Sequence, residues 1–183
     1  MKKAKGDRVS NIQLTALDGS PFDLDSTRGK RCLIAFFRFA GCPFCNLRVH
    51  DLVKKYPSFG PNFTIVAIFD SPLKDLQRHA AKHNAPFPVL ADETKSYYQE
   101  YGIERSLWGT LKGAILRFPT VLYAVFVKGY IPTSFGGNIM TMPADFLVNE
   151  YGVIEVAHYG SDEGDHIPIE LVTQFSHGSV EKA

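Results

Sequence analysis

The sequence between residues 32 and 45 reads CLIAFFRFAGCPFC. Its first half is a short apolar and aromatic run bounded by glycines, a pattern typical of a buried β-strand, which we predict over residues 31–37. Beyond it, apolar residues recur at helical spacing to about Tyr56, and Pro43 suits the first helical position, where its missing N–H costs nothing. The pattern therefore places Cys42 and Cys45 at the N-terminus of a helix that follows a buried strand.

A cysteine pair at a helix N-terminus indicates redox chemistry, because free N–H groups and the helix dipole stabilise the nucleophilic thiolate. Three other interpretations are weaker. A zinc site needs a second pair of ligands, and the sequence offers only Cys32 inside the strand and His50 nearby. A structural disulfide across four residues gains little from loop closure. An inert core pair does not fit a proline and a helix start between the two cysteines.

Length and composition indicate the class of protein that carries this dithiol. With 183 residues, 45% hydrophobic, we expect a single domain over residues 1–183 with one sizeable core. The 20 basic and 19 acidic side chains nearly balance, and no dense basic block indicates nucleic-acid binding. The start MKKAKGDR is basic but no apolar stretch follows it, so we expect a cytoplasmic protein whose cysteines are kept largely reduced. No cofactor is indicated.

Strands and helices alternate along the chain. A second continuous apolar run over residues 63–69 predicts another buried strand, and two such strands joined by a helix make a parallel βαβ unit. The other predicted elements are a hairpin over 12–24, a helix over 71–83, an edge-like segment over 86–90, a helix over 92–101, a hairpin over 146–157 and a last helix capped by Asp165 and running through Phe175.

Two segments carry a resemblance to a known family: the strand with its CPFC motif, and MPADFLVNEYG over residues 142–152. On these residues the chain resembles thioredoxin-fold proteins of the alkyl hydroperoxide reductase/thiol-specific antioxidant superfamily, including peroxiredoxin-like and thiol-disulfide oxidoreductase relatives. The resemblance implies an α/β, thioredoxin-like fold: a central mixed sheet flanked by helices, with an N-terminal hairpin and an apolar insertion over residues 104–141. It also implies an antioxidant role in cell redox homeostasis.

The resemblance makes Pro143 a site residue, because the family has a cis proline there that faces the dithiol. A cis bond is essentially a proline device, and we expect one at Pro143 if the protein exchanges disulfides. Departures from the peroxiredoxins matter equally. Their peroxidatic cysteine falls on Cys45, but their helper threonine falls on Cys42, their proline on Arg38 and their later arginine near Pro143. The family's residues for peroxide binding are therefore incomplete in this chain, whereas its residues for disulfide exchange, the C-x-x-C pair and Pro143, are all present.

Three functional hypotheses follow. The first is a thiol-disulfide oxidoreductase in which Cys42 attacks as the more exposed thiolate and Cys45 resolves the mixed disulfide. The second is a peroxiredoxin-like thiol peroxidase that reduces hydroperoxides with Cys45 as its peroxidatic cysteine. The third is a non-catalytic binding module. The implied partners are a thiol or disulfide protein, or a small hydroperoxide, together with an external thiol electron donor.

Several polar residues are further candidates. Arg38, four residues before Cys42, either lowers a thiol pKa or steers an anion, or else its charge reaches out to water. Asp70 suits a helix cap better than a proton carrier, and Arg48 suits a solvated helix face. Loop glycines and the capping role of Asp165 argue against a metal site, although four residues are of ligand type: His158, Asp162, Asp165 and His166.

The apolar stretch over residues 107–131 is the main departure from the family pattern. It has helical spacing, but Lys112, Arg117 and Pro119 interrupt it too often for a membrane-spanning helix. We expect it to lie near the dithiol. Core padding or a homo-oligomer through residues 107–131 is the first interpretation, and a lid, a partner groove or an interfacial membrane anchor are the alternatives.

Overall fold

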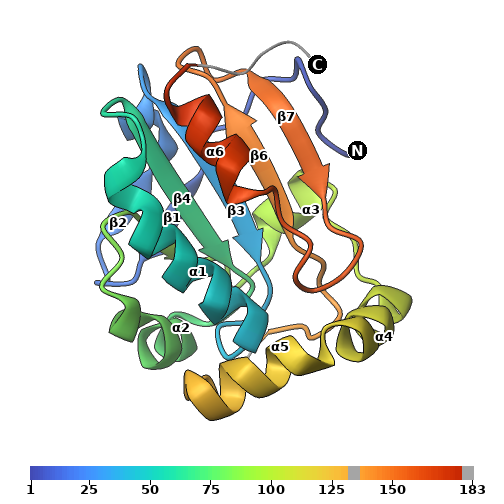
Figure 1. Cartoon of the computed structure of the whole chain (residues 1–183). Helices are drawn as coiled ribbons and strands as arrows, with labels where there is room; N and C mark the ends of the chain where they lie inside the picture. Colours follow the sequence, from blue (N-terminus) through green and yellow to red (C-terminus); the bar gives the residue numbers. More distant parts are fainter. Residues whose placement is uncertain (132–136, 179–183) are drawn as a thin grey trace.

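The computed structural model describes residues 1–131 and 137–178. Its strands form one mixed seven-stranded sheet in the order β2-β1-β5-β4-β3-β6-β7 (Figure 1). Strand β3 is parallel to β4, β4 is parallel to β5, and the remaining pairs are antiparallel. The strand bounds are β1 Gln13–Ala16, β2 Pro21–Asp23, β3 Arg31–Phe37, β4 Phe63–Phe69, β5 Val89–Ala91, β6 Ala144–Val148 and β7 Ile154–Tyr159.

The predicted central strands are confirmed, because β3 and β4 occupy the ranges that their apolar runs indicated. Strand β5 corrects one expectation. It is not at an edge of the sheet but lies between β4 and β1, since the N-terminal hairpin pairs with it through Thr15 opposite Ala91 and Ala16 opposite Leu90. The short segment is therefore covered on both sides by other strands, and all three of its residues are buried.

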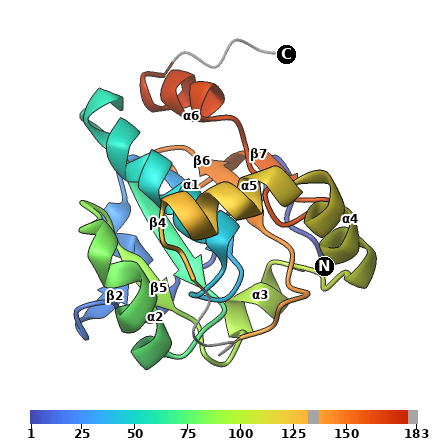
Figure 2. The ribbon, with the colours of Figure 1, turned by 60° about the horizontal axis from the view of Figure 1, so that its bottom comes forward.

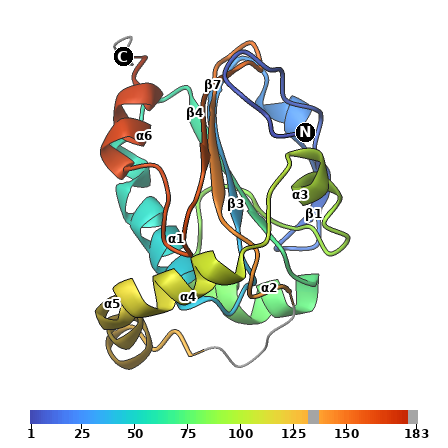
Figure 3. The ribbon, with the colours of Figure 1, turned by 90° about the vertical axis from the view of Figure 1, so that its right-hand side faces the viewer.

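Helices cover both faces of the sheet (Figure 3). Helices α1 Pro43–Lys55 and α6 Ile169–Ser176 lie on one face, and α3 Ser96–Glu100 lies with the N-terminal segment on the other; α2 Leu73–Ala80 follows β4. Successive side chains of a strand point to opposite faces, so Phe37 joins the core that contains Cys42 and Cys45, whereas Phe36 and Cys32 join the opposite core. The third cysteine is therefore separated from the dithiol by the sheet. Short helical turns complete the path at η1 Leu24–Thr27, η2 Tyr56–Ser58 and η3 Ala81–His83.

Two predicted helices begin later than expected. The helix predicted over residues 92–101 is the short α3, because the Asp92 carboxylate accepts the N–H groups of Ser96 and Tyr97 and holds a turn ahead of it. Helix α6 starts after Pro168, so Asp165 does not cap it. The Asp165 carboxylate instead accepts the Ser161 N–H at 2.8 Å.

The apolar insertion forms helix α4 Leu107–Leu116, helix α5 Phe118–Leu122 and the π-helical turn η4 Tyr123–Val127. Figure 2 shows α4 and α5 lying across the end of the molecule where α1 begins. Among the described residues no single helix is long and apolar enough to span a membrane, although Leu107–Gly113 and Phe118–Val127 together reach the required length and composition across a bend of 76°.

Candidate active site around Cys42

The loop after β3 holds Cys42 at the N-cap of α1, with Pro43 in the first helical turn. The Cys42 carbonyl accepts the backbone N–H of Asn46 at 3.0 Å and its side-chain Nδ2 at 2.9 Å. The same Nδ2 donates to the carbonyl of Ala40 at 2.8 Å, and Asn46 Oδ1 lies 2.9 Å from Nε2 of His83. Asn46 therefore ties both ends of the cysteine turn to the helix, and the predicted position of the dithiol at a helix N-terminus is confirmed.

Both thiols are buried, and all three cysteines are free. Cys42 is 1% exposed and Cys45 is 0% exposed, so the expectation that Cys42 is the more accessible thiol is wrong. The insertion contributes to this burial. Val121 of α5 packs against the core that contains both cysteines, and α5 and η4 contact α1. A substrate can reach either sulfur only when part of this cover moves.

Arg38 is buried and lies beside Cys42. Its guanidinium Nη1 is 3.7 Å from the Cys42 sulfur, and its Nε donates to the carbonyl of Thr141 at 3.0 Å. At 4% exposure the side chain does not reach out to water, so that interpretation of Arg38 is wrong. The charge is instead held against the sulfur by a residue from the loop before β6.

Asp70 fixes this loop from the end of β4. Its carboxylate accepts the Thr141 hydroxyl at 2.7 Å and pairs with Lys95 at 3.0 Å. The cap of α2 is Pro72, so Asp70 does not have the capping role that its sequence position suggested. Its structural effect is to hold Thr141, whose carbonyl positions the Arg38 guanidinium.

The two thiols of the pair have different acidities. Burial opposes ionisation of Cys42, but the hydrogen bond from Cys45 and the charge of Arg38 outweigh it and lower the pKa of Cys42 to about 7. Burial, together with the hydrogen bond to Cys42 and its charge, raises the pKa of Cys45 well above its ordinary value. Burial alone raises the pKa of Cys32 to about 12. Cys42 is therefore the thiol that ionises near neutral pH.

Glu163 is a second buried charge at the site, and no motif or spacing in the sequence marks it. Its Oε1 lies 3.7 Å from Nη1 of Arg38, and the side chain is 5% exposed. Within the described chain, its Oε2 has no hydrogen-bond partner. Burial raises the pKa of Glu163, an effect that the Arg38 charge partly offsets. The carboxylate rests against α4, where a Cβ added at Gly113 would overlap it.

The expected cis peptide bond at Pro143 is not present, because the bond is trans. The residue is buried before β6, and its carbonyl accepts the Gly160 N–H at 2.9 Å. Its ring lines a cavity of about 190 Å³ together with Met142 and Tyr159, and neither cysteine of the pair lines that cavity. The feature that the exchange hypothesis required at this position is thus not present.

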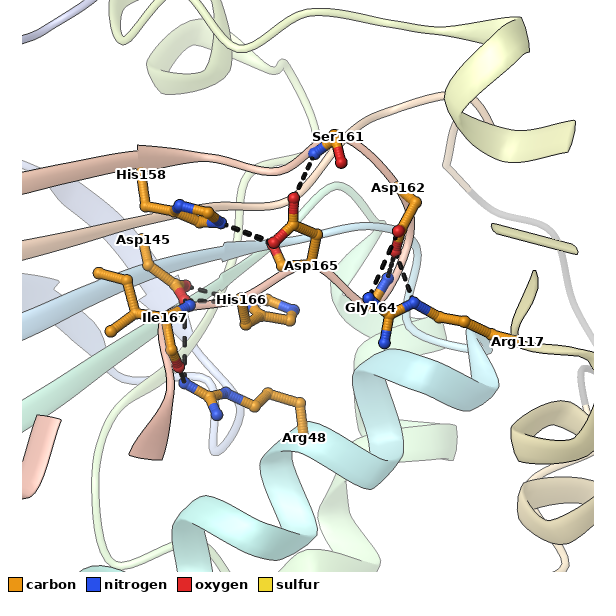
Figure 4. A network of polar contacts seen from close by, with 10 residues as sticks. All are labelled: Arg48, Arg117, Asp145, His158, Ser161, Asp162, Gly164, Asp165, His166 and Ile167. Atoms are coloured by element: carbon orange, nitrogen blue, oxygen red, sulfur yellow. Dashed lines mark hydrogen bonds and ion pairs between the residues drawn. The ribbon is translucent and has the colours of Figure 1, made fainter. Parts of the chain in front are cut away.

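A buried polar network flanks α1 on the face of the sheet that carries the dithiol (Figure 4). Asp145 of β6 accepts the Ile167 N–H at 2.8 Å and lies 3.0 Å from Nδ1 of His166. Arg48 donates to the Ile167 carbonyl at 2.6 Å and lies 3.8 Å from Asp145. The side chain of Arg48 is only 12% exposed, so its prediction as a solvated helix residue is wrong.

The four residues of metal-ligand type are distributed over three separate contacts (Figure 4). His158 pairs with Asp165 at 2.9 Å, and Asp162 pairs with Arg117 of the insertion at 2.7 Å. His166 belongs to the Asp145 network. Within residues 1–131 and 137–178, no group of three or more His, Cys, Asp or Glu side chains converges on a point that could hold a metal ion.

Comparison with known proteins identifies the relatives of this chain. A sequence model of the AhpC/TSA family matches residues 5–157. The chain is 28% identical over 115 residues to the chloroplastic peroxiredoxin Q of Triticum aestivum, covering 61% of this chain and 52% of that protein. The corresponding protein of Sedum lineare is 27% identical, covering 61% of each. The chain thus spans about half the length of the first of these curated relatives and somewhat more of the second.

Solved structures show the same thioredoxin-like fold. Peroxidoxin BcpB of Mycobacterium tuberculosis superposes with a TM-score of 0.70 at 14% identity, covering 98% of this chain and 99% of that one. A cysteine-to-serine variant of PrxQ from Xylella fastidiosa has a TM-score of 0.64 at 15% identity and 99% coverage of both chains. A Chlorobium tepidum protein described as a thiol:disulfide interchange protein, DsbE, has a TM-score of 0.61 at 16% identity, covering 99% of this chain and all of that one.

Proposed function

Because this chain belongs to the AhpC/TSA family of thiol-dependent oxidoreductases, we propose that it is such an enzyme, with Cys42 as the attacking thiolate and Cys45 as the resolving thiol. The observation that carries this proposal is the position of Cys42 at the N-cap of α1, with the Arg38 guanidinium 3.7 Å from its sulfur, and the direction of the pKa shifts agrees with it. The pKa of Cys42 is lowered to about 7, whereas that of Cys45 is raised well above its ordinary value. Only the thiolate form is nucleophilic, so Cys42 reacts first.

A hydroperoxide is the substrate class that family membership favours. The Cys42 thiolate attacks the O–O bond, a sulfur–oxygen bond forms, and the leaving oxygen takes up a proton to become an alcohol or water. The Cys45 thiol then attacks the Cys42 sulfenic acid, water leaves, and a disulfide joins the two residues. An external thiol electron donor returns the pair to its reduced form.

Arg38 supports this choice of attacking sulfur. Its guanidinium lies 3.7 Å from Cys42, where it can stabilise negative charge that develops on the leaving oxygen. The earlier alternative with Cys45 as peroxidatic cysteine is less well supported, because the pKa of Cys45 is raised well above its ordinary value. Arg38 thus supplies, from the residue directly after β3, the positive charge that the family resemblance placed near Pro143.

Disulfide exchange is the second candidate, and the C-x-x-C spacing with an acidic first cysteine favours it. In that reaction Cys42 attacks a substrate disulfide, a mixed disulfide forms as one substrate thiol leaves, and Cys45 then displaces the other. The trans bond at Pro143 counts against it.

The deciding experiment compares the rate at which hydrogen peroxide and a protein disulfide oxidise the reduced protein in stopped flow. Faster oxidation by peroxide than that of a free thiol supports the first candidate. Faster oxidation by the protein disulfide than by peroxide supports the second. Failure of both reagents to form the Cys42–Cys45 disulfide would leave the non-catalytic binding module as the better hypothesis.

A single domain, a cytoplasmic location and a homo-oligomer through residues 107–131 stay predictions. Sedimentation equilibrium at several protein concentrations tests the oligomer, and fractionation of the cells that produce the protein tests its location.

A further inference from the structure

The large apolar side chains of the insertion are exposed to solvent. Fourteen large hydrophobic residues are exposed in the described chain, and eleven of them lie between Leu107 and Ile131. Trp108 is 80% exposed and Phe126 is 79% exposed. We call this set the insertion face; its members are Leu107, Trp108, Leu111, Ile115, Leu116, Phe118, Leu122, Tyr123, Phe126, Val127 and Ile131.

Small residues form the inner side of the same elements. Gly109 and Gly113, one helical turn apart, are buried, and a Cβ added at Gly109 would lie 2.7 Å from the Met142 sulfur. Ala124 of η4 is fully buried. A surface helix of a globular protein normally turns its large apolar side chains inward. Here that arrangement is reversed, so the insertion face is not core padding and needs an apolar partner outside the chain.

Charge identifies that partner. The segment from Arg105 to Ile131 carries four basic residues and no aspartate or glutamate, in a chain whose charges otherwise nearly balance. Arg117 is paired with Asp162, whereas Lys112 is exposed beside the insertion face. In a symmetric dimer the same positive segments would meet, which is unfavourable. An anionic lipid surface offers both an apolar interior and opposite charge.

We propose that the insertion face docks in the plane of an anionic lipid bilayer. Helix α4 is ten residues long, or about 15 Å, and the hydrocarbon core is about 30 Å thick, so α4 cannot cross it. The bend of 76° after α4 also suits two short helices that lie along a surface. Trp108 and Tyr123 then sit at the level of the lipid headgroups, where such rings concentrate, and the stem of Lys112 reaches outward from the apolar layer.

This orientation places the dithiol close to the lipid. Figure 2 views the molecule from the end that α4 and α5 cover, with the start of α1 directly behind them. Contacts of α5 and η4 with α1 agree with that view. The membrane surface would therefore lie one layer of helices away from Cys42, whether the substrate is a hydroperoxide or a disulfide.

The single tryptophan provides a direct test, because Trp108 is the only one in the chain. Vesicles of phosphatidylcholine alone are compared with vesicles of equal parts phosphatidylcholine and phosphatidylglycerol. We expect a blue shift of the Trp108 fluorescence and flotation of the protein with the anionic vesicles only, both weakening as salt rises. Lys112→Gln should weaken the partition about fivefold.

Two substitutions distinguish binding through the insertion face from nonspecific adsorption to vesicles. Phe126→Ser should weaken binding, whereas Tyr151→Ser, at a 71% exposed aromatic residue in the turn after β6, should leave it unchanged. Equal binding to both kinds of vesicle, or to neither, would overturn the proposal. So would a fluorescence shift that depends on protein concentration without vesicles and is lost in Phe126→Ser, because a second copy would then cover the face. None of these readouts depends on turnover at the dithiol.

Discussion

Replacing Arg38 by methionine should raise the pH at which Cys42 becomes reactive. The substitution keeps the length of the side chain but removes a guanidinium that lies 3.7 Å from the sulfur. In the native protein the pKa of Cys42 is lowered from an ordinary 9.0 to about 7, which corresponds to about 3 kcal/mol in favour of the thiolate. The Cys45 hydrogen bond is the largest of four lowering effects, ahead of the Arg38 charge and two backbone N–H groups, so Arg38 accounts for only part of the shift.

A shift of the midpoint by about one pH unit is therefore the expected result. At pH 7 the ionised fraction of Cys42 falls from about one half to about one tenth, a loss of about fivefold. A more basic thiolate is also about threefold more nucleophilic, so the alkylation rate at pH 7 falls only about twofold. Above pH 9, where both proteins are ionised, the variant should react about threefold faster than the native protein. The plots of alkylation rate against pH for the native protein and for Arg38→Met should therefore cross.

Iodoacetamide alkylation across the pH range, located by peptide mass, measures this profile. The control is Glu163→Gln, which removes the carboxylate 3.7 Å from Arg38 and should leave the midpoint where it is or lower it. If Arg38→Met does not fold because Glu163 is left buried and unpaired, the double variant Arg38→Met with Glu163→Gln carries the same test. An unchanged or lowered midpoint in the Arg38 variants would refute the role given to the guanidinium.

Three further outcomes are expected. Cys45→Ser should leave Cys42 able to attack but not to resolve, so that a sulfenic acid or mixed disulfide accumulates as added mass, whereas Cys42→Ser should be inactive; the reverse pattern would make Cys45 the attacking sulfur. Asp145→Ala should cost about 3–5 kcal/mol in urea unfolding. Burial opposes ionisation of Asp145, but contacts with His166 and Arg48 outweigh it and lower the pKa of Asp145. The stability that the carboxylate contributes to the native protein is therefore complete above the ordinary 3.8 and is lost as pH falls through the lower folded pKa. The destabilisation by Asp145→Ala should shrink over the same pH range. Gly113→Ala should destabilise the protein by about 1–3 kcal/mol despite the better helix propensity of alanine, whereas Lys112→Ala at an exposed neighbour should change stability by less than about 0.5 kcal/mol.

Local pattern was sufficient for the elements that carry the cysteines. The apolar runs of β3 and β4 are continuous because both faces of these strands are covered, and this pattern shows directly in the sequence. Pro43 marks the helix start in the same direct way. The position of Cys42 at the N-cap of α1 follows from these local signals, and so does the expectation of an acidic thiol.

The surroundings of Cys42 depend on contacts between residues far apart in the chain. Glu163 meets Arg38 only because the loop after β7 folds back over the end of β3, and no local signal marks one glutamate within an acidic loop. Arg48 has the spacing of a surface residue, yet the loop before α6 and strand β6 supply contacts that bury it. The insertion contributes to the burial of both thiols, and its packing side combines Val121 and Ala124 with Gly109 and Gly113, which leave little hydrophobic pattern in the sequence.

The place of Glu163 against Gly113 links access to the site with its electrostatics. Substrate can reach Cys42 only if part of the insertion moves, and any movement of α4 that lifts Gly113 from the carboxylate admits water to Glu163 and Arg38. Hydration lowers the penalty that burial places on the charged forms of Cys42 and Glu163. The same water screens the Arg38 charge, so a movement that admits a substrate also changes the electrostatic surroundings of the sulfur, and access and thiol acidity are coupled through one contact.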